Sequence, residues 1–486
     1  MSVYKVKPVY KKAIKCYKQD MNKLFELLTL KFEDANWARF PEIALIDTVL
    51  EEHPGIIRMM KDDVCRGSSE SNFGRKDMPS VEQIVRGAIY KEIRHVDYEE
   101  FDKQQDDSRV CEKFLKLDGK LFSEKTWQKY ISRITADSLD KLMVGINKIA
   151  IGLGYEDLKR IVEDSTAVET NIHYPTNNSL VWGEPTVRCI KESHRLLSQL
   201  KEEIDGVDYR NYLIDAKKTC FKINNAKTDD KRVKLFKKQL VTFTKTINQL
   251  SNVVKKKSVY MDLTPLATGV IVLMENFLPV AQKVFSITYR HEIKGEKVPN
   301  DEKIVSIYEQ HTDILVKGKR EIVFGHKVDF VCGRSNLILG VNVTKGNPSD
   351  TTLYEGAMDK LIRDYGKVPD SSTTDGGYAS KKNQEYAKKL GVKNIVFNKI
   401  VGSLKNIASS KNMETRLKKW RSSAEAIISN LKRGFDLRRC MWKGSAHFDQ
   451  KVYWSVIGYN IRVMAAHVLE TFGYRERYRR RPRERP

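Results

Sequence analysis

The run Arg160-Ile-Val-Glu-Asp-Ser-Thr-Ala-Val168 constrains the fold of this chain more than any other segment. Its β-branched residues are typical of a strand. A carboxylate, Asp164, lies at its centre, where an acidic side chain is poorly tolerated without a compensating partner. We therefore expect a strand whose acidic residue has a function. The pattern becomes helical again after this run, so the strand must find partners much further along the chain.

Strand patterns resume after residue 320. Segments 321–331 and 336–344 predict an antiparallel pair joined by a turn at 333–335. A further short strand ends on Asp375 and is followed directly by Gly376 and Gly377. Around it the pattern predicts another strand at 392–398 and helices at 351–365, 381–390, 414–433 and 451–469.

A helical block at about 186–306 separates the first strand from the others. Without this block, the elements follow the order of an RNase H-like core, an α/β fold whose first and fourth strands are neighbours. Asp164 and Asp375 are then expected to meet at one end of a mixed sheet. Mg²⁺ prefers oxygen ligands and keeps several waters, so a few carboxylates and DNA phosphate oxygens suffice to bind it. Two such ions can assist an in-line displacement at phosphorus.

A stripe of charge on the helix predicted at 414–433 adds a third acid. Arg421, Glu425 and Lys432 are spaced so that they project from one helical face. A carboxylate between two cations suits a site that holds a metal ion and a phosphate. The alternative is an ordinary i, i+4 surface salt bridge, worth a few tenths of a kcal/mol. The presence of Asp164 and Asp375 favours the first interpretation.

These segments resemble the DDE transposases of bacterial insertion sequences, and most closely the ISNCY family. The resemblance covers roughly residues 75–470 and rests on four motifs: 164–175 (DSTAVETNIHYP), 324–327 with 343–350 (FGHK, VTKGNPSD), 374–378 (TDGGY), and the R-(3)-E-(6)-K spacing of Arg421, Glu425 and Lys432. The tyrosine expected three residues before the arginine is replaced here by Lys418.

The resemblance implies a division of roles at the site. It implies that the catalytic ligands of two Mg²⁺ ions, which Mn²⁺ can replace, are Asp164, Asp375 and Glu425. It also implies that DNA phosphate is held by two cations, Arg421 and Lys432. The implied reaction is metal-dependent cleavage of the DNA at the terminal inverted repeats of an element, followed by transfer of the 3′-hydroxyl end to target DNA.

Other residues near these motifs have less defined roles. Gly376 and Gly377 are expected to allow close approach of backbone or DNA, because glycine has no Cβ, although a simple turn is the alternative. His326 is interpreted as a strand histidine with satisfied hydrogen bonds rather than a DNA contact. Asp329 and Asp350 are further acids near the strands, but no motif supports a ligand role for either.

The N-terminal region, up to about residue 155, is predicted to be helical. Ser80 and Gln83 form a capping-box pattern at one helix start. Lys125, Lys129 and Arg133 lie on short helices that could form a helix-turn-helix-like DNA reader, with a plain helical bundle equally compatible with the spacing. The helical block at 186–306 is expected to pack over the active site or along DNA, with a passive spacer as the alternative.

Composition favours a nucleic-acid partner. The formal net charge is +24 and the isoelectric point is near 9.5, which favours nucleic acid ahead of a membrane surface. The apolar stretch 263–281 is interrupted by prolines and polar residues, so we expect a buried helix pair rather than a membrane span. A lysine-rich opening and an arginine-rich end at 474–486 are predicted to be a solvated arm and a phosphate-seeking tail.

Seven scattered cysteines without a C-x-x-C pair indicate reduced thiols in a cytoplasmic protein, and the first residues lack the apolar core of a signal peptide. The resemblance adds that this cytoplasm is bacterial and that the protein associates with the nucleoid.

The sequence therefore predicts a multidomain α/β protein with an RNase H-like core. The expected divisions are a DNA-end-binding and dimerisation domain at 1–155, the first core strand at 156–185, the insertion at 186–306, the rest of the core at 307–450, and a C-terminal helix with its basic tail at 451–486. A homodimer or larger assembly on double-stranded DNA is expected. The alternatives are an RNase H-like nuclease without strand transfer and a non-catalytic DNA-binding protein derived from a transposase.

Overall fold

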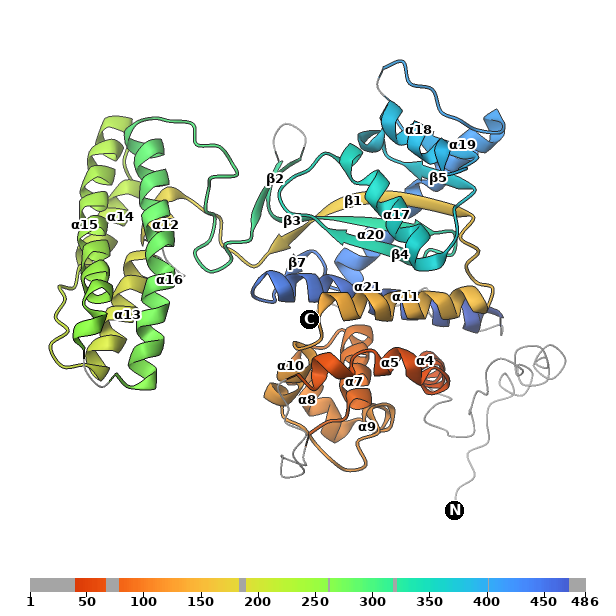
Figure 1. The fold of residues 1–486 in the computed structure, drawn as a ribbon, viewed down its shortest axis with the longest axis horizontal. Helices are drawn as coiled ribbons and strands as arrows, with labels where there is room; N and C mark the ends of the chain where they lie inside the picture. The colour runs from red at the N-terminus through yellow and green to blue at the C-terminus, as the bar shows by residue number, and fades with distance from the viewer. Residues whose placement is uncertain are drawn as a thin grey trace. The chain divides into compact units, whose positions relative to one another are not determined.

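A computed structural model describes residues 40–66, 78–182, 189–260, 263–317, 321–400 and 402–471. The chain forms two compact units (Figure 1). The sheet unit comprises the described residues up to Val168 and from Lys327 onward, and the insertion unit comprises Glu169–His326. The basic N-terminal arm and the arginine-rich tail predicted from the sequence lie outside the described residues.

One mixed sheet carries all the strands of the described residues. Its order is β2-β3-β1-β5-β6, with β4 also paired to β3 and β7 paired to β1. The strands are β1 (Arg160–Thr170), β2 (Asp313–Lys317), β3 (Glu321–Gly333), β4 (Ile338–Val343), β5 (Ser371–Thr374), β6 (Asn394–Phe397) and β7 (Arg439–Cys440). The predicted antiparallel pair is confirmed as β3 and β4. The sequence patterns did not reveal β2 or β7.

The register of two parallel strands determines where the acids lie. β1 and β5 run parallel, with Glu163 opposite Thr374, and β5 and β6 are parallel as well. Asp164 and Asp375 each follow one residue after that last pair. Because parallel strands place equivalent residues at the same level of the sheet, the register brings these two carboxylates to the same end of the paired segment.

The helices of the sheet unit that follow the strands are α17 (Tyr354–Tyr365), α18 (Lys381–Lys389), α19 (Lys411–Trp420), α20 (Ser422–Gly434) and α21 (Ser445–Thr471). The prediction of one continuous helix at 414–433 is wrong, because the chain is interrupted at Arg421, between α19 and α20. There the N–H of Ala424 bonds to the carbonyl of Arg421, three residues back. This tighter turn is typical of 3₁₀ geometry within a helical segment.

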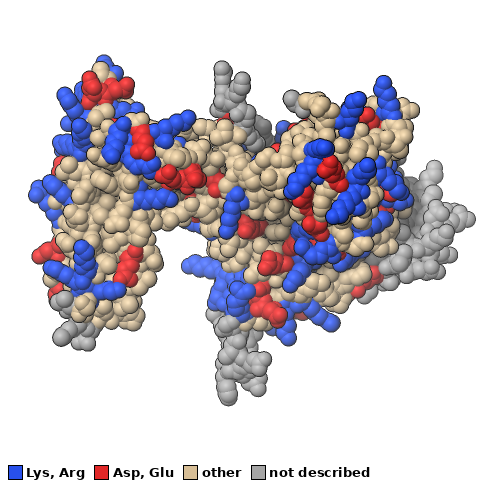
Figure 2. All heavy atoms as spheres, turned by 45° about the horizontal axis from the view of Figure 1, so that its top comes forward, with Lys and Arg blue, Asp and Glu red and all other residues tan. Residues whose placement is uncertain are grey.

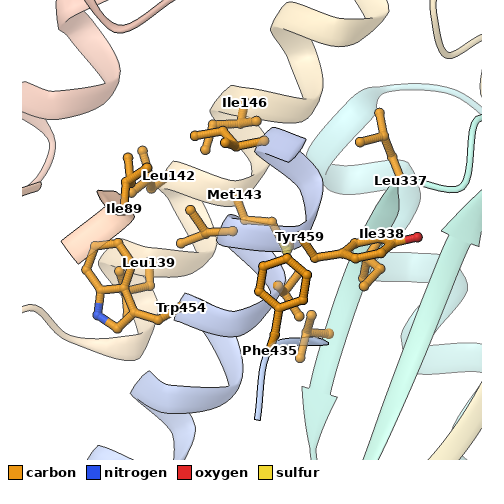
Figure 3. Packing of buried hydrophobic residues seen from close by; sticks show 14 of the residues in the cluster. Ile89, Leu139, Leu142, Met143, Ile146, Leu337, Ile338, Phe435, Trp454 and Tyr459 are labelled. Atoms are coloured by element: carbon orange, nitrogen blue, oxygen red, sulfur yellow. The ribbon is translucent and has the colours of Figure 1, made fainter. Parts of the chain in front are cut away.

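The N-terminal region is helical, as predicted. Its helices are α4 (Pro41–Glu52), α5 (Pro54–Arg58), α6 (Lys61–Val64), α7 (Val81–Arg94), α8 (Tyr98–Asp107), α9 (Arg109–Leu115), α10 (Glu124–Ile131) and α11 (Ala136–Gly152). Figure 3 shows α11 and α21 side by side in the core, with Leu139 near Trp454 and with Ile338 of the sheet beyond them. Asn460 of α21 ties this layer to the sheet, because it accepts from the N–H of Ile338 and donates to the same residue's carbonyl.

The capping box predicted at the start of α7 is confirmed. Ser80 Oγ accepts from the N–H of Gln83 at 3.1 Å, and Gln83 Oε1 accepts from the N–H of Ser80 at 2.8 Å. We expect Ser80→Ala to lower the free energy of unfolding by about 1 kcal/mol, because the cap hydrogen bond is lost. Urea unfolding followed by circular dichroism measures this change. Ser80→Asp, which keeps an acceptor, should stay near wild type, and equal losses in the two variants would contradict the capping role.

The insertion unit contains a helical bundle. Its helices are α12 (Asn177–Trp182), α13 (Cys189–Glu203), α14 (Leu213–Asn224), α15 (Asp229–Lys255) and α16 (Pro265–Thr288), followed by a π-helical turn at Tyr289–Ile293. The expected helix pair at 263–281 is wrong, because Pro279 is accommodated inside a single helix, α16. In the described part of the chain, Pro265–Ile293 is the one helix long and apolar enough to cross a membrane by length and composition, and a third of its most apolar window is buried against the bundle.

Candidate active site

Arg421 lies close to both predicted carboxylates, Asp164 and Asp375. Its Nη1 lies 3.5 Å from Asp164 Oδ2 and 3.8 Å from Asp375 Oδ1. The arginine side chain is only 8% exposed, whereas those of Asp164 and Asp375 are 17% and 45% exposed. A buried guanidinium beside two carboxylates forms a compact charged centre that opens to solvent on the Asp375 side.

The pKa of Asp164 is unusually high for an aspartate. Burial, the largest cause, raises the pKa of Asp164 to about 6, and the nearby Asp375 raises it further while Arg421 opposes the shift. The ionised form of Asp164 is therefore destabilised near neutral pH. An added cation would relieve this destabilisation, which suits a site that binds positively charged ligands.

Glu425 approaches the same arginine from α20. Arg421 Nη2 donates to Glu425 Oε1 across one helical turn, and the Glu425 side chain is 60% exposed. The surface salt bridge considered from the sequence is thus present, but its arginine is buried and also faces the two aspartates. Lys432 is half-buried on α20, two turns beyond Glu425.

A second pair of acids is buried within the sheet. Asp329 on β3 is 1% exposed and accepts a hydrogen bond from Tyr378 Oη at 2.6 Å. Burial raises the pKa of Asp329 to about 7, and burial together with Asp329 raises that of Glu163 well above its ordinary value. Asp329 therefore holds Tyr378, three residues after Asp375, against β3.

The two glycines after Asp375 are explained by contacts within the protein. A Cβ on Gly376 would lie 2.6 Å from the carbonyl oxygen of Lys399 and 2.7 Å from that of Asn398. A Cβ on Gly377 would lie 2.8 Å from Asp350 Oδ2. The turn η4 (Gly376–Tyr378) therefore fits between the end of β6 and Asp350 only because both residues lack a side chain.

Three residues without a role in the sequence interpretation also lie at this centre: Ser165, Lys327 and Asp350. Ser165 Oγ and Lys327 Nζ both donate to Asp350 Oδ1, at 2.9 and 3.1 Å. Asp350 closes the motif Gly-Asn-Pro-Ser-Asp after β4. The place of Asp350 at the end of this motif is the sequence signal that points to it. Spacing along the chain does not reveal that the loop carrying Asp350 folds back to β1.

His326 lies in the insertion unit, within a hydrogen-bonded chain of side chains. Its Nε2 faces His311 Nδ1 at 2.7 Å and its Nδ1 faces Asp313 at 2.8 Å, while His311 Nε2 faces Glu309 at 2.8 Å. The interpretation of His326 as a strand histidine with satisfied hydrogen bonds is confirmed.

The predicted N-terminal DNA contacts lie at or near α10. Lys125 and Lys129 are exposed. Arg133, just after this helix, is half-buried, donates to the carbonyl of Val64 at 3.1 Å and lies over the ring of Tyr130. The two lysines are therefore available to a ligand, while the guanidinium of Arg133 is already engaged within the sheet unit.

The residues at this centre fit a divalent metal in their chemistry. Over the described ranges, no group of three or more His, Cys, Asp or Glu side chains is arranged to hold a metal ion. Asp164 and Asp375 supply hard oxygen donors from neighbouring strands, and both lie within 4 Å of one Arg421 nitrogen. Such a pair suits Mg²⁺, which binds through one or two carboxylates, waters and phosphate oxygens.

Comparison with known proteins supports a transposase in general. Residues 316–461 match a family described as a transposase DDE domain. The match includes Asp375, Arg421 and Glu425, whereas Asp164 lies before it, on the far side of the insertion. No curated protein and no solved structure matches the chain.

Proposed function

We propose that this protein is a DDE transposase with an RNase H-like core, related to the ISNCY family. One observation supports this proposal most strongly: Asp164 and Asp375 follow paired positions on adjacent parallel strands, and both face Arg421. The parallel pairing of β1 with β5 supports the expectation that the first strand of such a core lies beside the strand ending at the second aspartate. A purely structural salt bridge would not explain why a second carboxylate lies beside Asp164, where it raises the pKa of that residue.

The proposed chemistry assigns a role to each side chain. Asp164 and Asp375 would hold Mg²⁺ or Mn²⁺, with Glu425 as the third ligand once it exchanges its bond to Arg421. When bound, two such ions supply Lewis acidity to the attacking and leaving oxygens of an in-line displacement. Arg421, fixed by burial, orients Asp164 and Glu425. Its planar donors would turn to a DNA phosphate once these carboxylates bind metal ions instead. Lys432 is proposed to bind phosphate further along α20.

A basic surface next to this centre suits the DNA backbone. Residues 376–420 contain eleven Lys and Arg but only two Glu. Exposed members include Lys388 and Lys389 on α18 and Lys411 and Lys419 on α19. Figure 2 shows many Lys and Arg side chains over this part of the molecule. We propose that this surface guides DNA toward Asp375 and that the protein acts as a dimer or larger assembly on paired DNA ends.

The helix α10 provides a test of DNA-end binding. We expect the double variant Lys125→Ala/Lys129→Ala to make the slope of log K against log salt less steep by about 2, because each lost phosphate contact removes about 0.9. Fluorescence anisotropy on a duplex at several salt concentrations measures this slope. Lys103→Ala is the matched control, because Lys103 is an exposed lysine already paired with Glu99 at 3.0 Å. An unchanged slope in the double variant would favour the plain helical bundle.

The reaction itself can be tested with DNA from either side of the coding sequence. We expect the protein, with Mg²⁺ or Mn²⁺, to cut labelled duplexes that carry the terminal inverted repeats and to join their 3′ ends to a supercoiled plasmid. Cut but never joined products would favour the nuclease alternative. Specific binding without cleavage under any divalent metal would favour the non-catalytic alternative.

A further inference from the structure

Asp350 connects three segments around the active centre. It begins the short 3₁₀ turn Asp350–Thr352, and its Oδ1 accepts from Ser165 of β1 and Lys327 of β3. Lys327 Nζ also donates to the carbonyl of Pro348 at 2.6 Å, which holds the loop that carries Asp350. Ser165 directly follows Asp164, so one bond of Asp350 anchors the strand at the first carboxylate.

The other oxygen of Asp350 faces the turn after the second carboxylate. Oδ2 lies so close to Gly377 that a Cβ there would approach it to 2.8 Å, with Asp350 Cβ and Cγ at 3.5 and 3.6 Å. The three atoms nearest to that Cβ all belong to Asp350. Gly377 therefore leaves room for the Asp350 carboxylate at a place where any side chain would collide with it.

We propose that Asp350 is a positioning residue that couples the strand carrying Asp164 to the turn that follows Asp375, and so fixes the separation of these two carboxylates. The proposal rests on the proposed function of Asp164 and Asp375 as metal ligands. Asp350 acts through its neighbours: Ser165 and Lys327 hold one oxygen, and the other is packed against Gly377. Outer residues that orient metal ligands commonly change metal affinity or activity by about 10- to 100-fold when they are replaced.

The geometry predicts different outcomes for three substitutions. Asp350→Asn keeps an oxygen acceptor for Ser165 and Lys327, so Mn²⁺ affinity should stay within about threefold of wild type, well below the loss typical of a disrupted outer shell. Asp350→Ala removes the link and should weaken Mn²⁺ binding by at least about tenfold. Gly377→Ala should also weaken Mn²⁺ binding, because the new methyl group displaces the carboxylate. In the Asp350→Ala background, Gly377→Ala should cause no further loss.

Titration of the purified full-length protein with Mn²⁺, followed by electron paramagnetic resonance, measures these affinities without DNA. Cleavage rates on labelled duplex provide a second readout. Asp370→Asn and Gly356→Ala are matched controls: Asp370 precedes β5 at the opposite end from Asp375, and a Cβ on Gly356 meets nothing within 4 Å. Both controls should bind Mn²⁺ like wild type.

The possible outcomes separate this proposal from the proposed function. If wild type binds Mn²⁺ and cleaves DNA but Asp350→Ala does the same, only the positioning role is overturned. If Asp350→Asn loses as much affinity as Asp350→Ala, the carboxylate acts through its charge and not through its contacts. Additive losses in the Gly377→Ala/Asp350→Ala variant would also contradict the coupling. If wild type binds no Mn²⁺, both proposals fail.

Discussion

Replacing Asp164 with asparagine is expected to abolish metal-dependent DNA cleavage while making the metal-free protein more stable. The loss of a carboxylate that we propose binds the metal should lower the cleavage rate by at least about a thousandfold, since stabilisation by the metal ions is worth several kcal/mol. The gain in stability has a separate cause. The pKa of Asp164 is raised to about 6 by burial, so its ionised form weakens the folded state at neutral pH. Asparagine removes that charge.

The pH dependence of this gain follows from the direction of the pKa shift. The pKa of Asp164 is higher in the folded protein than its ordinary value of 3.8, so the stability linked to its protonation is fully present below about pH 4 and is lost as pH rises through about 6. A shift of about 2 units corresponds to about 3 kcal/mol. Wild type and Asp164→Asn should therefore unfold at similar urea concentrations near pH 4 and differ most above pH 6. Saturating Mg²⁺ should stabilise wild type at neutral pH and leave the variant unchanged.

Asp375→Asn provides the comparison for this test. It should lose cleavage as Asp164→Asn does, but its side chain is 45% exposed, so we expect a smaller gain in stability. Asp370→Asn, at the other end of β5, should keep full cleavage. A cleavage-competent Asp164→Asn or Asp375→Asn would show that these carboxylates are not the metal ligands. A variant of Asp164 that is inactive but less stable than wild type at pH 7.5 would contradict the electrostatic account.

Local patterns were sufficient to predict most elements of the sheet. The β-branched run around Asp164 and the alternation in 321–344 are encoded in adjacent residues, and the structure confirms β1, β3 and β4. The capping box at Ser80 is equally local. Asp375 was found because a short strand, an acid and two glycines follow one another directly. Features that depend on one or a few neighbours along the chain are the ones a single sequence can reveal.

The missed features depend on contacts between distant segments. Helical periodicity does not reveal the break at Arg421, because both flanking segments favour a helix. The partner of the arginine side chain, Asp164, lies 257 residues away in the sequence. The contact between Asp350 and Ser165 joins residues 185 positions apart. β2 is a short edge strand, defined by its pairing with β3 more than by its own composition. Pro279 favours a break in the helical segment, but α16 continues through it.

The roles of the two glycines illustrate the same limit. The sequence predicts close approach at Gly376 and Gly377 and leaves open whether the neighbour is DNA or the protein itself. The contacts identify protein atoms in both cases: backbone carbonyls of Asn398 and Lys399 for Gly376, and the Asp350 carboxylate for Gly377. The difference between a rigid backbone neighbour and a side chain that can rotate predicts unequal consequences when each glycine is replaced.

Gly376→Ala is therefore expected to be the more damaging of the two substitutions. Its Cβ would lie 2.6 and 2.7 Å from two backbone carbonyl oxygens just after β6, and these cannot rotate away as a side chain can. Overpacking of this kind typically lowers the free energy of unfolding by about 1–3 kcal/mol. The strain falls on the residue that follows Asp375, so the carboxylate should be displaced and the cleavage rate should fall by about a hundredfold, as expected for a misplacement near 1 Å.

Urea unfolding and duplex cleavage measure the two effects of Gly376→Ala separately. Gly356→Ala is the matched control, since a Cβ there meets no atom within 4 Å and alanine favours the helix α17 by about 0.5–1 kcal/mol. Cleavage should be compared at a urea concentration and temperature where the variant is fully folded, so that loss of folded protein is not mistaken for loss of activity. A folded Gly376→Ala protein with wild-type cleavage would mean that the turn can move without displacing Asp375, and that the tight packing beside β6 does not define the geometry of the site.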